Sequence, residues 1–249
     1  MIIPAMRLTL SKPWHTIRRM RLKLALLLAL LLTACAPALP DLPPNDIVIK
    51  AGQAMLQVPS FHFKIEISGA PVYLNRATAL QLRSAEGDFA RPDRMGVHLK
   101  VIAAVAAAEL DMIAIGNEQY LTNILTQQWE VLPPEFGFNP AVMFDPTFGI
   151  EQVLSGGIDA AKLVGVETIE SASVYHVSGQ LDGARVQGMS GGLIGTGRVE
   201  AEVWVDGSTF VPRKAIVIDR SVDAEKPTTW TLTFGSYGKT VNITAPEVK

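Results

Sequence analysis

Residues 198–219, RVEAEVWVDGSTFVPRKAIVID, carry the clearest secondary-structure pattern in the chain. From Arg198 to Val205 the residues alternate with the two-residue period of a strand that has one dry and one wet face. Asp206-Gly207 supplies turn residues, and a second β-rich run follows over Val211–Ile218. Pro212 has no N–H for a sheet ladder, which predicts a strand start or an edge. The residues expected on the wet face are Arg198, Glu200, Glu202 and Trp204.

This stretch predicts a β-hairpin, and a hairpin alone cannot form a stable domain. The remaining chain must therefore supply more strands and a layer that covers them. Of the 249 residues, 48% are hydrophobic and 18% are charged, which is typical of a globular protein and not of a disordered one.

The N-terminus has the composition of an export signal. The first forty residues contain six basic residues and no acidic one, and an apolar run covers Leu24–Leu32. Such a run is too short to span a bilayer but fits the core of a signal peptide. It ends in Leu32-Thr33-Ala34-Cys35, which resembles the lipobox of bacterial lipoproteins, and Cys35 is the only cysteine of the chain. The alternative is a free, buried cysteine beside a chance apolar run.

The lipobox implies a domain organisation. Residues 1–34 are expected to be a lipoprotein signal peptide, 35–45 a Pro-rich tether that starts at a lipidated Cys35, and 46–249 a single domain. The start codon is open among Met1, Met6 and Met20. With no second cysteine, the domain cannot form a disulfide and is held by its core. The protein is then exported and anchored on the extracytoplasmic side of a membrane.

Removing the leader makes the chain more acidic. The six basic residues leave with the signal peptide, so 16 of the 22 Lys and Arg remain against 24 Asp and Glu, a net charge of −8. A field of this sign disfavours nucleic acid as a partner.

Most of the mature chain has the pattern of strands. A short helix is expected over Asp46–Val58, and a non-β insert with Ile150, Val153 and Leu154 on one helical face is expected over Leu132–Gly157. Residues 101–108 are small and uncharged, so a helix competes with two strands there; the alternation on both sides favours strands. Besides the hairpin, strands are expected at Phe61–Ile67, Leu80–Arg83, Met95–Val105, 109–115, Gln119–Ile124, Val164–Thr168, Tyr175–Leu181, Thr229–Phe234 and Val241–Thr244.

The inward faces of these strands have two interpretations. They form either an ordinary packed core or the wall of a cavity, for which the small residues over Val101–Ala108 would leave space. Periodicity alone selects the candidate lining residues. They are Phe61, Phe63, Ile65, Leu80, Leu82, Val97, Leu99, Val101, Leu110, Met112, Phe148, Val153, Leu154, Tyr175 and Val177.

Five motifs in order resemble one bacterial lipoprotein family. They are LTAC at 32–35, GDFARPDRM at 87–95, IGNEQYLTN at 115–123 followed by Trp129, VWVDGSTFVPRKAIV at 203–217 and FGSYGKTVNITAP at 234–246. Together they are similar to LppX/LprG-type (LppX_LprAFG) lipoproteins, whose fold resembles that of the lipoprotein carrier LolA and its receptor LolB. The resemblance implies an α+β, mostly β, fold. Its strongly curved antiparallel half-barrel encloses an apolar cavity, with helices covering the concave face.

Two catalytic or metal-binding patterns are weak. Gly188-Met189-Ser190-Gly191-Gly192 fits G-x-S-x-G, but that motif needs a following helix and a histidine further along the chain. All four histidines precede Ser190. The mature histidines His62, His98 and His176 lie on separate predicted strands without metal-ligand spacing. We therefore predict no catalytic residue, no metal and no cofactor.

The leading hypothesis is a membrane-anchored lipoprotein that binds lipid acyl chains in the cavity and carries or presents lipids or lipoglycans in the cell envelope. Its partners would be a lipid ligand, the membrane and an envelope transporter or receptor protein. The alternative is a non-catalytic envelope sensor or interaction module with a filled core.

Overall fold

The computed structural model describes residues 39–75, 80–104, 106–133, 140–147 and 149–248. Cys35, Phe136, Phe138 and Phe148 lie outside the described residues. Leu39–Lys249 form one compact unit. Its strands are β1 (Ser60–Ser68), β2 (Val72–Asn75), β3 (Leu80–Ala90), β4 (Arg94–Ala103), β5 (Ala106–Ile115), β6 (Glu118–Thr122), β7 (Trp129–Val131), β8 (Asp159–Ile169), β9 (Ala172–Leu181), β10 (Val199–Asp206), β11 (Pro212–Asp219) and β12 (Thr228–Gly235).

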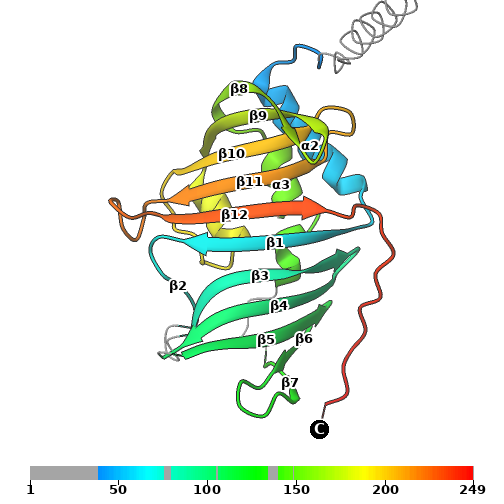
Figure 1. Cartoon of the computed structure of the whole chain (residues 1–249), viewed down its shortest axis with the longest axis vertical. Helices are drawn as coiled ribbons and strands as arrows, with labels where there is room; N and C mark the ends of the chain where they lie inside the picture. Colours follow the sequence, from blue (N-terminus) through cyan, green and yellow to red (C-terminus); the bar gives the residue numbers. More distant parts are fainter. Residues whose placement is uncertain (1–38, 76–79, 105, 134–139, 148, 249) are drawn as a thin grey trace, which may run out of the picture. The chain divides into compact units, whose positions relative to one another are not determined.

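These strands form one open, curved, antiparallel sheet (Figure 1). The order is β7-β6-β5-β4-β3-β1-β12-β11-β10-β9-β8, and β2 pairs with β3 outside this path. Neighbours in sequence are mostly neighbours in the sheet. The exception is at the centre, where β1 pairs with β12 over His62–Ser68 and Thr229–Gly235. This pairing joins the N-terminal strands to the C-terminal ones, and the mostly β, antiparallel fold is confirmed.

The hairpin predicted over residues 198–219 is confirmed as β10 and β11, and Pro212 is the first residue of β11. Its turn is fixed by Asp206, whose carboxylate accepts hydrogen bonds from the backbone N–H groups of Ser208 and Thr209 and from the guanidinium of Arg213. Burial alone would raise the pKa of Asp206, but these hydrogen bonds outweigh it and hold the pKa well below its usual range.

The wet face of this hairpin is less exposed than the alternation predicts. Trp204 is only 5% exposed. Its ring stacks on His176 with 4.0 Å between the ring centroids, and the ammonium of Lys214 lies 4.3 Å from the ring centroid. Polar neighbours on adjacent strands therefore cover an aromatic residue that the sequence places toward water.

The helix near the N-terminus begins earlier than predicted. Helix α2 spans Pro44–Gln57, with a proline in its first turn, where the missing N–H costs nothing. Its buried face, Ile47, Val48, Ala51, Gly52 and Met55, contacts β8, β9 and β10.

The described end of the predicted tether also packs on the domain. Leu39 and Leu42 contact the hydrophobic cluster under α2, and the hydroxyl of Tyr175 donates to the carbonyl of Pro40 at 2.7 Å. Residues 39–43 therefore form part of the folded unit.

The strands differ from the prediction in several places. The strand expected at Leu80–Arg83 continues through Glu86-Gly87-Asp88 to Ala90, because these residues pair with β1 and β4. A Cβ on Gly87 would lie 2.1 Å from the carbonyl oxygen of Gly96, so this position requires glycine for close strand approach. Strands β2 and β7 are additions. Val241–Thr244 is not a strand, although Ile243 is buried and its carbonyl accepts a hydrogen bond from Arg94.

The prediction of strands rather than a helix around residues 101–108 is confirmed, since β4 and β5 pair along Arg94–Ala103 and Ala106–Ile115. The non-β insert contains a 3-10 helix η2 (Pro140–Phe144) and helix α3 (Ile150–Ser155). Helix α4 (Gly183–Met189) is not predicted from sequence; Asp182 caps it by accepting a hydrogen bond from the Ala184 N–H. Helix α3 contacts α2 and α4, while η2 contacts β4 and β5. That helices cover the concave face stays a prediction.

Candidate functional site

The strand register places one continuous apolar row across the sheet. The row runs Leu110, Leu99, Ala85, Ile65, Leu232, Ala215, Val203 and Val177, one residue from each of eight adjacent strands. A second row passes through Ile67, Trp230, Val217 and Ala201. Because successive side chains of a strand alternate between faces, both rows point to the same side. Ala85, Ala201 and Ala215 are too short to fill the space in front of the sheet.

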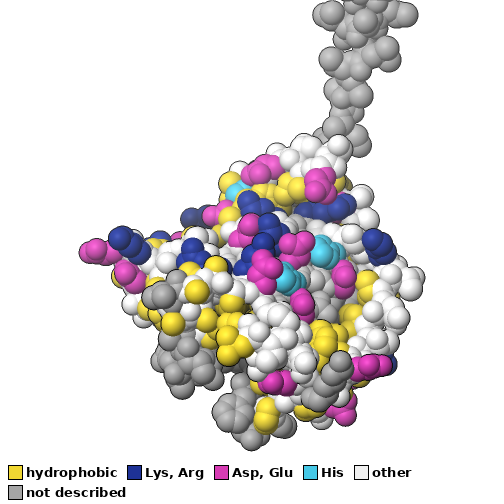
Figure 2. Space-filling model, turned by 60° about the horizontal axis from the view of Figure 1, so that its bottom comes forward, with side chains coloured by type: hydrophobic (Ala, Val, Ile, Leu, Met, Phe, Trp, Pro, Cys, Tyr) yellow, Lys and Arg dark blue, Asp and Glu magenta, His cyan; other side chains and the backbone are white. Residues whose placement is uncertain are grey.

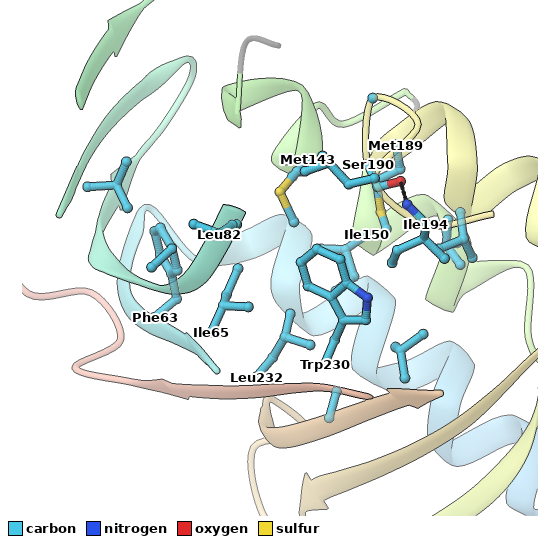
Figure 3. A pocket seen from close by; sticks show the side chains of 18 of the residues that line it. Phe63, Ile65, Leu82, Met143, Ile150, Met189, Ser190, Ile194, Trp230 and Leu232 are labelled. Atoms are coloured by element: carbon cyan, nitrogen blue, oxygen red, sulfur yellow. Dashed lines mark hydrogen bonds between the residues drawn. The ribbon is translucent and has the colours of Figure 1, made fainter. Parts of the chain in front are cut away.

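Except for Val177 and Ile67, the residues of these rows form one wall of a cavity of about 430 Å³ (Figure 3). That volume lies within the range of roughly 300–1,000 Å³ that is typical of small-molecule sites. The opposite wall comes from the helical insert and from the segment around α4. It consists of Met143, Ile150, Val153, Leu154, Ile158, Val186, Met189, Ser190, Gly191, Leu193 and Ile194.

The segment after α4 is held by Ser190. The Ser190 hydroxyl donates to the carbonyl of Gln187 at 3.2 Å and accepts from the N–H of Ile194 at 3.1 Å, the hydrogen bond marked in Figure 3. Gly191 and Gly192 have φ values of 61° and 83°, a conformation that favours glycine. The G-x-S-x-G pattern is thus explained locally by a tight turn that places Leu193 and Ile194 at the cavity.

Ten of the fifteen candidate lining residues lie among the residues that line the cavity. They are Phe63, Ile65, Leu80, Leu82, Val97, Leu99, Leu110, Met112, Val153 and Leu154. That these side chains contact a lipid stays a prediction.

Four other candidates are placed elsewhere. Phe61 packs in an aromatic cluster with Phe89 and Phe144, at centroid distances of 5.3 and 4.9 Å. Val101 is buried but does not line the cavity, and none of the described residues 101–108 does, so the space does not come from that small-residue run. Tyr175 and Val177 pack under α2 in the second hydrophobic cluster. The remaining candidate, Phe148, lies outside the described residues.

Sequence reasoning missed the residues that matter most for the shape of the cavity. Ala85, Ala201 and Ala215 are isolated small residues in otherwise ordinary strands, and only the register places them among the larger residues of the inward-facing rows. Trp230 is in a correctly predicted strand, and its inward direction follows from alternation with Leu232 and Phe234. That alternation was a usable signal for Trp230.

A buried ion pair fixes the helical wall. Glu151 of α3 is fully buried, and one of its carboxylate oxygens accepts a hydrogen bond from Arg91 at 2.5 Å. Arg91 also donates to the carbonyls of Met55 and Val58 at the end of α2, at 2.9 and 2.8 Å. Burial raises the pKa of Glu151, and Arg91 opposes this shift only in part. One side chain thus connects the β3–β4 turn, α2 and α3.

The three described histidines and their carboxylate partners lie on the outer face of the sheet. Each described histidine faces two carboxylates: His62 lies 3.0 Å from Asp88, His98 lies 2.8 Å from Asp111, and His176 lies 2.7 Å from both Glu167 and Glu202. Further distances of 3.4 and 3.5 Å join His62 to Glu86 and His98 to Glu109. Figure 2 shows histidine side chains among acidic ones on one face of the molecule.

A second hollow of about 790 Å³ adjoins the cavity, because Val153 and Met189 line both. It lies between α3 and α4 and carries polar side chains, among them Gln152 and Arg185. An apolar chamber thus lies next to a more polar one.

The family model described as LppX_LprAFG lipoprotein matches residues 43–243, and the chain belongs to this family. The resemblance stated from the sequence motifs is confirmed. Membership in a lipoprotein family implies an exported, envelope-associated protein. Among the described residues no helix has both the length and the apolar character needed to cross a bilayer.

Two solved structures show the same fold. The first is LprF from Mycobacterium bovis, with 16% identity and a TM-score of 0.65 over 84% of this chain and 99% of that chain. The second is the lipoprotein LppX from Mycobacterium tuberculosis, with 15% identity and a TM-score of 0.59 over 81% of this chain and 98% of that chain. A comparison with curated proteins finds no match.

Proposed function

We propose that this lipoprotein binds acyl chains of lipids in its cavity and carries or presents them in the cell envelope, without catalysing a reaction. The observation that supports this function is the apolar cavity of about 430 Å³ in the centre of the fold. Burial of an alkyl chain there would gain about 0.8 kcal/mol for each CH₂ group removed from water. A sensor with a filled core, the alternative hypothesis, does not account for this space.

The second hollow suggests where the polar end of the lipid lies. Acyl chains would occupy the cavity, and the head group would extend past Val153 and Met189 toward Gln152 and Arg185. A head group there keeps hydrogen-bonding partners while the chains leave water. Sugar or phosphate groups of a lipoglycan fit this arrangement.

Lipid binding is tested by native mass spectrometry of residues 36–249, the soluble form without Cys35. We expect part of the purified protein to retain lipid, and the emptied protein to take up acyl lipid from phospholipid vesicles. A protein that purifies without lipid and takes up none from vesicles contradicts the proposed function.

The second part of the proposal is an anchor at Cys35. Two or more acyl chains on this cysteine would hold the protein stably on the extracytoplasmic side of a membrane, where a single chain would not. Metabolic labelling with radioactive palmitate should mark the wild-type protein and not Cys35→Ala, and only the wild type should sediment with membranes. Equal labelling of the two proteins would show that the lipid is attached elsewhere or not at all.

A further inference from the structure

Trp230 brings a buried hydrogen-bond donor to the cavity. Its side chain is 5% exposed, and its indole Nε1–H has no hydrogen-bond partner among the described residues. Of the buried polar side-chain atoms without a partner in the described part of the chain, it alone belongs to a residue that lines this cavity. Buried donors are normally paired, since leaving one unpaired costs free energy.

The position of the ring follows from the sheet. Trp230 lies on the inward face of β12, paired with Ile67 of β1 on one side and Val217 of β11 on the other. Figure 3 shows the indole rising from the sheet, with its nitrogen turned to the side where Ile194 and Ser190 lie. The apolar part of the ring contributes to the wall. The indole nitrogen itself is buried, so an acceptor oxygen in the cavity reaches it only when neighbouring side chains shift.

The nearby hydroxyl does not duplicate this donor. The Ser190 proton is used in the hydrogen bond to the Gln187 carbonyl, and one lone pair accepts from Ile194. A hydroxyl has one donor proton, so Ser190 can at most accept a further bond from a ligand. Among the side chains of the described lining residues, Trp230 therefore has the one donor hydrogen that is not already used.

The cavity also lacks a cation. Its described lining residues include no lysine, arginine or histidine, and the carboxylate of Glu202 is bonded to His176 on the outer face. An ionised carboxylate brought into such surroundings would be desolvated without a counter-charge, which is strongly unfavourable. A neutral carbonyl oxygen needs only one hydrogen-bond donor.

We propose that Trp230 is a specificity-determining residue that donates its indole N–H to the carbonyl oxygen of an esterified acyl chain, so that the cavity selects neutral esters over free fatty acids and over plain hydrocarbons. This inference rests on the proposed function, because it assumes that the cavity holds a lipid. It adds a polar contact at a defined atom to a site that otherwise binds by apolar burial.

The test compares three probes of similar chain length: methyl palmitate, palmitate at pH 8 and heptadecane. Binding to the full chain in a nonionic detergent is measured by native mass spectrometry for the wild type, Trp230→Phe and Trp204→Phe. The first variant keeps an aromatic ring in the cavity and removes the N–H. The second makes the same change on the outer face, where the indole N–H donates to Glu167 at 2.8 Å.

We expect Trp230→Phe to bind methyl palmitate about fivefold more weakly, the effect of losing one neutral hydrogen bond. Heptadecane binding should stay the same, and Trp204→Phe should keep the wild-type preference for the ester. The indole Nε1–H signal of Trp230 in proton–nitrogen NMR spectra should move downfield with the ester and not with heptadecane.

Three outcomes overturn the inference while leaving lipid binding intact: an unchanged ratio of ester to hydrocarbon affinity in Trp230→Phe, palmitate binding that equals ester binding at pH 8, or an unmoved indole signal. If the wild type binds none of the three probes, the proposed function itself fails.

Discussion

Ala215→Trp is expected to weaken lipid binding strongly and to leave the fold in place. Ala215 lies in the central row, between Leu232 of β12 and Val203 of β10, and lines the cavity. An indole at this position would extend into the space in front of the sheet. If it keeps about 100 Å² of acyl-chain surface from being buried, binding weakens by about 2.5 kcal/mol, close to a hundredfold in affinity.

The measurement is retention of lipid by residues 36–249, with circular dichroism and thermal unfolding to verify the fold. Overpacking of a solid core costs about 1–3 kcal/mol; a space of about 430 Å³ should reduce that cost. Ala107→Trp is the matched control, since Ala107 is an exposed residue of β5 that does not line the cavity. Full lipid retention by a folded Ala215→Trp protein would place the ligand outside this cavity.

Arg91→Ala is expected to destabilise the protein by about 3–5 kcal/mol at neutral pH, the usual cost of leaving a buried charge without its partner. Glu151 is fully buried, and the substitution removes both its ion pair with Arg91 and the hydrogen bonds to the carbonyls of Met55 and Val58. Urea denaturation followed by fluorescence gives the free energy of unfolding. A decrease below about 1 kcal/mol would contradict the role assigned to this ion pair.

The destabilisation should shrink in acid. Burial raises the folded-state pKa of Glu151 above its unfolded value, so its contribution to stability is fully present below the unfolded pKa and falls as the pH rises through the folded pKa. Without Arg91 this pKa rises further, so the variant should recover stability as the pH falls from neutral through the raised pKa toward the ordinary pKa of a glutamate, about 4.3. In the double variant Arg91→Ala/Glu151→Gln, no carboxylate remains to be buried. Its stability should therefore exceed that of Arg91→Ala at neutral pH and should not show the acid recovery.

The sequence predicts strands well where apolar and polar residues alternate. The hairpin over 198–219, the β4–β5 pair and β12 all follow from a period of two. Prediction from sequence fails where the place of a residue depends on which strand lies beside it in the fold. Gly87 resembles a turn residue, yet it lies inside β3 because β4 passes too close for a side chain. Val241–Thr244 alternates like a strand but is not part of the described sheet.

The cavity is a second case in which the sequence pattern is not enough. Alternation identifies inward-facing residues such as Ile65, Leu99 and Leu110, but it cannot tell a packed wall from a hollow one. That difference depends on which residues stand opposite one another across eight strands. Isolated alanines at 85, 201 and 215 become neighbours of larger side chains only through the register. Phe61 and Tyr175 have the period of inward-facing residues, but they do not line the cavity, because they pack against other aromatic rings.

The central pairing of β1 with β12 determines when the domain can fold. Ile65 near the start of the chain finds its partner Leu232 only after nearly all of the polypeptide has been synthesised. Contacts between residues so far apart in sequence form slowly, because a long loop must close first. Until β1 and β12 pair, the N-terminal strands and the C-terminal strands are not joined into one sheet. Completion of the interior therefore waits until nearly the whole chain is available.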